Sequence, residues 1–382
     1  MKIHRKWSHR FSLLLGVSIF IVAFRHVEKS VGTKEVQTFT IANDETKNLH
    51  KKGFTSKNSN ENYTRNNPVI TAYDVKFRNK LNTTFSLPGC LCNRHGPDKV
   101  VPEKSLCSES ATSRGYGQHV IGYTYFGGSW KQIQEHFMTI KTITKRAAEV
   151  YPEWIIRLHL RNVTFYNKQI HPTLCELFCS RKNFDVCVLE DLHNKTYNNF
   201  TAVQTNGRFW RMLPLLDPLV SVFMSRDIDA FILDREVVAV QEWMSSNLTY
   251  HILRDHPWHC LPMLAGLWGV KTSQIRHKHF EIWKKYVFAP IDGKKHWDQT
   301  LLQQYIYRNN LEYMEENTMF HDSYCCNRFP NVHHRPFQVK RDRYGNWCGG
   351  GQNYVLKYNK LVRANKCPIE CRPEKHREWE FC

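Results

Sequence analysis

The sequence LVSVFMSRDID, residues 219–229, is an apolar run that ends in two aspartates separated by one residue. The apolar part is typical of a buried strand, and a helix-like run from Arg235 to Met244 follows it. Because side chains alternate along a strand, Asp227 and Asp229 are expected to point in the same direction. Two carboxylates at a strand end suit a hard divalent cation that keeps positions open for phosphate oxygens. The alternative is a solvated acidic turn.

Three further strand-like runs precede this segment, with helix-like runs between them. They are His119–Phe126, Trp154–Leu160 and Asp185–Leu189. Ser129 and Gln132 form a capping-box pattern, after which apolar residues follow helical spacing as far as Val150, and Leu174–Cys179 continues a short helix. Strands that alternate with helices predict an α/β fold with a mostly parallel, Rossmann-like sheet flanked by helices. Ligands of such sheets bind at the carboxyl ends of the strands.

Composition excludes several classes of protein. Of the 382 residues, 41% are hydrophobic and 13% aromatic, which excludes a wholly disordered chain, and 23% are charged, which excludes a polytopic membrane protein. The 54 Lys and Arg against 35 Asp and Glu give a formal charge of +19. This surplus favours acidic partners such as phosphates, nucleotides, anionic glycans or lipid head groups, without choosing among them. No P-loop or Gly-x-Gly-x-x-Gly motif occurs, so those nucleotide-binding folds are excluded.

The N-terminus predicts a membrane anchor. Residues 1–10 are basic, and residues 11–24 (FSLLLGVSIFIVAF) carry no charge. This run is shorter than the roughly 20 residues of a typical span, but flanking basic side chains can lengthen it, and no small-residue cleavage site follows. We expect a cytosolic tail over 1–10 and an uncleaved signal-anchor over 11–24, with a cleaved signal peptide as the alternative. In both cases the bulk of the chain is lumenal.

The remainder divides by composition into a stem and one large domain. Residues 25–70 are polar and lack Cys and Trp, which predicts a flexible stem. Residues 71–382 are expected to form one lumenal domain whose C-terminal part, from about residue 330, is a basic, disulfide-rich cap. Glycosylation sequons begin at Asn62, Asn82, Asn162, Asn194, Asn199 and Asn247. These sequons and 13 cysteines indicate the secretory pathway, and the odd cysteine count leaves one thiol free or paired in a disulfide-linked homodimer.

The motif Arg226-Asp227-Ile-Asp229, behind an anchor and a stem, resembles that of type II Golgi glycosyltransferases of the GT-A fold. The resemblance covers about residues 120–330 and does not extend to a sugar-specific family. It implies that Asp227 and Asp229 hold Mn²⁺ or Mg²⁺ against the diphosphate of a nucleotide sugar, commonly a UDP sugar. It also implies a glycan or glycoprotein acceptor and a single-pass Golgi membrane protein. His321 matches by position a histidine that often supplies a third metal ligand; the alternative is an ordinary loop histidine.

Several charged residues are candidates for the nucleotide site. Arg208 and Arg211 are three residues apart at the start of a helical run and could meet a diphosphate together. A salt bridge with Asp217 or a solvated face is the alternative. The remaining candidates are Arg226, Arg254, Asp255 and His256.

Two further features suggest where sugars bind. The segment His296-Trp-Asp298-Gln299 resembles the Asp-Gln helix start near the acceptor site of many GT-A enzymes. In an inverting enzyme Asp298 would be the general base that takes the acceptor hydroxyl proton; the alternative is a structural N-cap. Trp258 or Trp268 could stack on a sugar ring, with buried core tryptophans as the alternative.

Two other functional classes compete with a glycosyltransferase. A Golgi sulfotransferase would suit the α/β pattern and the basic charge, but no convincing phosphosulfate-binding loop occurs early in the domain. A non-catalytic lectin or receptor on a degenerate transferase fold is the other, and the retained acidic motif and Asp298 speak against it. Nucleic-acid binding is disfavoured by the lumenal location.

Overall fold

The computed structural model describes residues 83–96, 99, 101–191, 205–289, 297–329, 332–351 and 355–382. All of these belong to the second of two units of the chain, residues 75–382. The predicted cytosolic tail, signal-anchor and stem lie outside the described residues. Among the described residues, no helix has the length and apolar character needed to cross a membrane.

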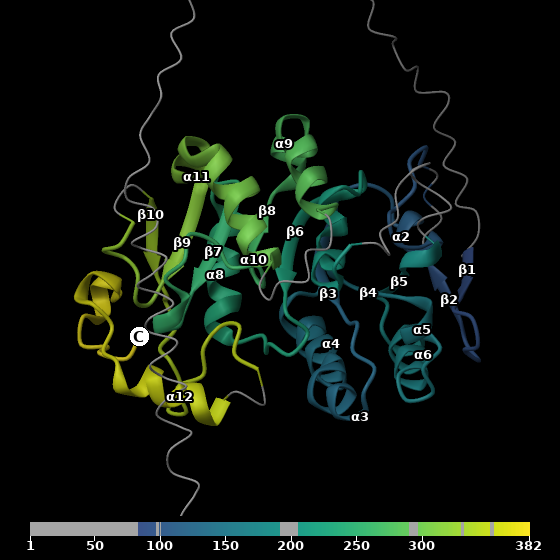
Figure 1. Cartoon of the computed structure of the whole chain (residues 1–382), viewed down its shortest axis with the longest axis horizontal. Coiled ribbons are helices and arrows are strands. Elements are labelled where there is room, and N and C mark those ends of the chain that lie inside the picture. Colours follow the sequence, from purple (N-terminus) through teal and green to yellow (C-terminus); the bar gives the residue numbers. More distant parts are fainter. Residues whose placement is uncertain are drawn as a thin grey trace, which may run out of the picture. The chain divides into compact units, whose positions relative to one another are not determined.

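Eight of the described strands form one sheet, in the order β10-β9-β7-β8-β6-β3-β4-β5, which runs from left to right in Figure 1. In that order the strands are His333–Pro336, Thr318–Asp322, Tyr250–Arg254, Leu267–Val270, Val220–Arg226, Gln118–Thr124, Trp154–Leu160 and Phe184–Val188. β8 is antiparallel to both of its neighbours, and every other pair in the sheet is parallel. The predicted mostly parallel α/β sheet is confirmed. A separate antiparallel pair consists of β1 (Thr83–Ser86) and β2 (Asn93–Gly96).

Helices cover both faces of this sheet. The α-helices of the described residues are α2 (Glu109–Thr112), α3 (Trp130–Gln132), α4 (Thr139–Val150), α5 (Asn162–Phe165), α6 (His171–Ser180), α8 (Asp234–Ser245), α9 (Thr272–Val287), α10 (Trp297–Leu301), α11 (Leu311–Asn317) and α12 (Val355–Ala364). Consecutive residues of β3 pack into different hydrophobic clusters. Val120 packs in the cluster that includes Trp283 of α9. Ile121 packs in the cluster that includes Ile140 of α4 and Trp243 of α8. This alternation follows from the pleat of the strand.

The helix that the sequence predicts after β3 is interrupted in the structure. Ser129 forms the predicted capping box with Gln132 at the start of α3. One turn of π-helix, Ile133–Phe137, then separates α3 from α4. Because a π turn holds more residues than an α turn, it changes which side chains face the sheet edge, and such turns are frequent at functional sites.

The strand order reverses next to β3. The chain runs from β3 outward through β4 to β5 and then returns to place β6 on the other side of β3. In open α/β sheets the carboxyl ends of the two strands at such a reversal border the ligand-binding crevice. The acidic motif follows β6 directly, so the topology places it at this crevice.

Disulfides involve twelve of the thirteen cysteines. Three bridges tie the N-terminal segment of the domain to α6 and β5: Cys90–Cys175, Cys92–Cys179 and Cys107–Cys187. Cys260–Cys325 joins the loop after β7 to the loop after β9. Cys326–Cys371 and Cys367–Cys382 secure the C-terminal part. The thirteenth, Cys348, is free and buried. A disulfide-linked homodimer through Cys348 would therefore require the C-terminal part to open.

Candidate functional site

A cavity of about 420 Å³ lies at the carboxyl ends of β3 and β6. Residues 124–127 at the end of β3 and residues 227–229 after β6 form two of its walls. Asp298 and Gln299 of α10 also line the cavity. The cavity thus gathers the acidic motif and the predicted acceptor-side aspartate, which are about seventy positions apart in the sequence.

The two motif aspartates are only partly buried. The side chain of Asp227 is 46% exposed and that of Asp229 25% exposed. The loop before β8 passes very close to Asp227, since a Cβ placed on Gly266 would lie 2.0 Å from Asp227 Oδ2. Only glycine therefore allows Asp227 its observed position. Burial, and then the charge of Asp227, raise the pKa of the Asp229 carboxyl above its ordinary value.

Arg211 joins the acidic motif to Asp298. Its Nη1 donates to Asp227 Oδ1 at 2.6 Å, and its Nη2 donates to Asp298 Oδ2 at 3.1 Å. Both Arg211 and Asp298 are buried. Burial by itself would lower the pKa of the Arg211 guanidinium, but Asp227 and Asp298 outweigh it and raise that pKa. Arg211 is therefore a fixed positive charge between two carboxylates.

The local sequence explains how Arg211 reaches the cavity. It lies in a 3-10 helix, Gly207–Leu215, that packs across β3. A Cβ on Gly122 of β3 would lie 2.2 Å from the Arg211 carbonyl oxygen, so glycine permits this approach. The alternative partner of Arg211, Asp217, instead pairs with Arg157 at 2.6 Å.

Arg208 and Phe126 form the end of the cavity next to β3. Both line it, and the Arg208 guanidinium lies 5.9 Å from the centre of the Phe126 ring. Phe126 is 49% exposed, so part of its ring is accessible to a ligand in the cavity.

The π turn brings His136 to the acidic motif. His136 lines the cavity, and its Nδ1 lies 3.5 Å from Asp229 Oδ2. Thr139 fixes this turn, because its hydroxyl is within hydrogen-bond reach of both the His136 carbonyl and, at 2.6 Å, the Ile228 carbonyl inside the motif. Sequence analysis missed His136, since no motif contains it and the π turn leaves no clear mark in the apolar spacing.

The predicted nucleotide-site residues Arg226, Arg254, Asp255 and His256 do not line the cavity. Arg226 points to the opposite side of its strand from Asp227 and pairs with buried Glu236 at 2.8 Å. Arg254 makes two hydrogen bonds to Asp322, at 2.5 and 2.6 Å.

Asp255 and His256 also have partners within the fold. Asp255 pairs with Arg341 at 2.5 Å and with Arg235 at 3.0 Å. His256 is buried, with its ring 4.7 Å from that of Trp347. His259, three residues further on, does line the cavity.

His321, the predicted third metal ligand, is also outside the cavity. It is buried in β9, where its Nδ1 lies 2.9 Å from His251 Nε2 and its Nε2 lies 3.1 Å from Glu242 Oε2. Both ring nitrogens are therefore engaged within the fold, and the structure does not bring His321 to Asp227 and Asp229.

The two candidate stacking tryptophans differ in exposure. Trp268 is buried in the core, whereas Trp258 is 62% exposed. Trp258 belongs to the 3-10 turn Pro257–His259, which also carries His259 to the cavity. Trp258 alone of the two is available to a ligand.

The C-terminal part supplies a wall of the cavity. Gly349 lines it, and the neighbouring Gly350 and Gly351 pair with the backbone that follows the acidic motif, through a bridge between Ala230 and Gly351 and a 3.3 Å hydrogen bond from the Phe231 amide to the Gly350 carbonyl. The predicted cap thus touches the site itself, in addition to being held by disulfides.

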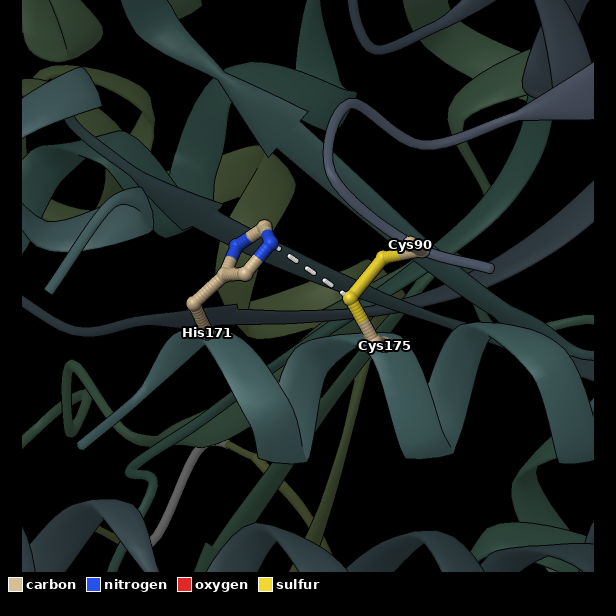
Figure 2. A group of neighbouring side chains, drawn as sticks. All are labelled: Cys90, His171 and Cys175. Carbon is tan, nitrogen blue, oxygen red and sulfur yellow. Dashed lines mark hydrogen bonds between the residues drawn. A yellow bond between two sulfur atoms is a disulfide. The ribbon is translucent and has the colours of Figure 1, made fainter. Parts of the chain in front are cut away.

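Two groups of three potential metal ligands occur among the described residues, and the covalent structure argues against both. In the first, Figure 2 shows His171 beside Cys175 on one helix, with the Cys175 sulfur bonded to that of Cys90. The second consists of Asp322, Cys326 and His334. Cys326 is bonded to Cys371, so neither group offers a thiolate.

The acidic motif fits a divalent cation better. Its donors are carboxylate oxygens, which hard cations prefer, and they face a cavity in which oxygens of a ligand can complete the coordination. Burial, and then the charge of Asp227, raise the pKa of the Asp229 carboxyl, and a bound cation would offset both effects.

No protein-family model matches this chain, and comparison with curated proteins returned no match.

Proposed function

We propose that this protein is a metal-dependent glycosyltransferase of the GT-A fold that uses a nucleotide-diphosphate sugar, most simply a UDP sugar. The observation that carries the proposal is the joining of Asp227 and Asp298 by Arg211 across one cavity at the strand-order reversal. A transferase of this kind needs a metal–diphosphate subsite and a carboxylate near the acceptor hydroxyl, and the cavity provides candidates for both.

The donor would lie along the wall formed by β3 and β6. Asp227 and Asp229 would hold Mn²⁺ or Mg²⁺, which when bound neutralises the charge on the departing diphosphate. Arg208 is placed to contact phosphate oxygens, and the exposed ring of Phe126 offers a stacking surface for a nucleobase.

Asp298 would act on the acceptor. Arg211 fixes its Oδ2, which leaves Oδ1 to accept the proton of an attacking hydroxyl. Exposed Trp258 would form the outer rim for a glycan or glycoprotein acceptor. The proposal includes an anchored, type II position in the Golgi membrane, which rests on the sequence alone.

The test is calorimetry of the full-length protein in detergent with UDP and Mn²⁺, compared with Asp227→Ala/Asp229→Ala. Asp234→Ala, an exposed acid of α8, is the matched control. We expect metal-dependent UDP binding by the wild type and the control, and none by the double variant. If the folded wild type binds neither UDP, GDP nor CMP with metal, the proposal fails and a lectin becomes the leading alternative. Transfer activity that resists a chelator would instead favour a sulfotransferase.

A further inference from the structure

The contact between His136 and Asp229 suggests a shared ligand. Their facing atoms, Nδ1 and Oδ2, are 3.5 Å apart, which is long for a hydrogen bond. Two ligand atoms that are each about 2.1 Å from one metal ion and about 90–110° apart at the ion lie about 3.0–3.4 Å from each other. The observed separation is close to that range. A cation at Asp229 could therefore be reached by His136 with only a small adjustment.

The surroundings hold His136 in this position. The π turn presents its ring to the cavity, and Thr139 ties the turn to the Ile228 carbonyl between the two motif aspartates. The His136 side chain is 31% exposed and that of Asp229 25%, so an ion can reach both. The histidine expected from the sequence, His321, has both ring nitrogens engaged elsewhere.

We propose that His136 is a nitrogen ligand of the divalent cation held by Asp229, in the role that sequence analysis gave to His321. This inference rests on the proposed function, because it presumes a cation at the acidic motif. A mixed nitrogen and oxygen ligand set favours a transition metal over Mg²⁺. The site is therefore selective for Mn²⁺ over Mg²⁺, and His136 is the source of that selectivity.

The test is pulsed electron paramagnetic resonance of Mn²⁺ bound to the full-length protein in the presence of UDP. A directly coordinated imidazole gives nuclear modulation from its ¹⁴N, which an imidazole that only orients Asp229 does not give. We expect this modulation in the wild type and its loss in His136→Ala. It should persist in His259→Ala, because His259 is the other imidazole among the described residues that line the cavity. It should also persist in His277→Ala, an exposed control on α9.

A Mn²⁺ titration completes the test. His136→Ala is expected to weaken Mn²⁺ binding at least about tenfold. Its affinity for Mg²⁺, measured by displacement of Mn²⁺, should change less. Bound Mn²⁺ without ¹⁴N modulation in the wild type would overturn the role of His136 and leave the donor site intact. Absence of Mn²⁺ uptake by the folded wild type with UDP would overturn the donor site as well. Should His136→Ala fail to fold, modulation that survives in His259→Ala supports His136, and modulation lost there assigns the ligand to His259.

Discussion

An Arg-Asp dipeptide ends two strands of the same sheet, and the two copies have opposite surroundings. Arg226-Asp227 lies at the end of β6, and Arg254-Asp255 at the end of β7. Both arginines are buried and paired with another acid, Glu236 and Asp322 respectively. The aspartates differ, since the side chain of Asp255 is fully buried whereas that of Asp227 is 46% exposed.

The two carboxylates differ in the number of hydrogen-bond donors that contact them. Asp255 accepts from Arg341, from the Ser323 hydroxyl and from the Cys348 amide, and pairs with Arg235. Asp227 is bonded to Arg211 and otherwise faces the cavity. A carboxylate with all its lone pairs satisfied stabilises the fold and has no capacity for a ligand. A partly satisfied carboxylate at a crevice can bind one. Motif identity alone does not separate the two cases.

The largest expected effect comes from removing the Asp255 carboxylate, whose hydrogen-bonding capacity is fully used within the fold. Asp255→Ala leaves two buried arginines without their partner, so we expect a loss of about 3–5 kcal/mol of stability. Thermal unfolding of the variant measures this. A variant with an unchanged melting temperature would show that Asp255 does not stabilise the C-terminal part.

Asp229, the neighbour of Asp227 in the acidic motif, should respond in the reverse way. Asp229→Asn removes a charge that repels Asp227, so the melting temperature should stay the same or rise, while metal-dependent UDP binding is lost. Calorimetry and thermal unfolding on the same preparation measure both. Retained UDP binding would contradict the assignment of Asp229 to the metal.

A smaller and more local effect is expected at Gly266. In Gly266→Ala the new methyl group displaces the Asp227 carboxylate, and we expect Mn²⁺ affinity to fall about tenfold, as for loss of a supporting contact to a metal ligand. Gly128→Ala is the control, because a Cβ there meets no atom within 4 Å. Equal Mn²⁺ affinity in the two variants would show that the position of Asp227 is not critical.

The smallest expected effect is on pH dependence. Burial would raise the pKa of Asp255, but Arg235 and Arg341 outweigh it and lower that pKa below its ordinary 3.8. The folded pKa is below the unfolded one, so the stability that ionised Asp255 provides is complete above the unfolded value and is lost as pH falls through the folded value. Asp255→Asn should therefore flatten the decline of melting temperature below about pH 4. A decline as steep as in the wild type would contradict this.

Local patterns predicted those elements whose residues interact mainly with their neighbours in sequence. Periodicity located β3, β4 and β5 to within two residues, and the Ser129 capping box appeared as predicted. The same reasoning placed Asp227, Asp229 and Asp298 at strand and helix ends, where the structure brings them to one cavity. It failed where a residue's role depends on a distant partner. Arg254 is a predicted nucleotide-site residue, but in the structure it pairs with Asp322, which is 68 positions away.

Residue type and short-range spacing were sufficient to predict the alternation of strands and helices, the acidic strand end and the disulfide-rich character of the domain. Which charged residues remain available to a ligand depends on contacts between segments that are distant in the sequence. The π turn brought His136 to Asp229, the approach of the 3-10 helix to Gly122 set Arg211 between two carboxylates, and the C-terminal part saturated Asp255. The physical reason is that a buried charge requires compensation, and its compensating partners come from segments that meet only when the chain has folded.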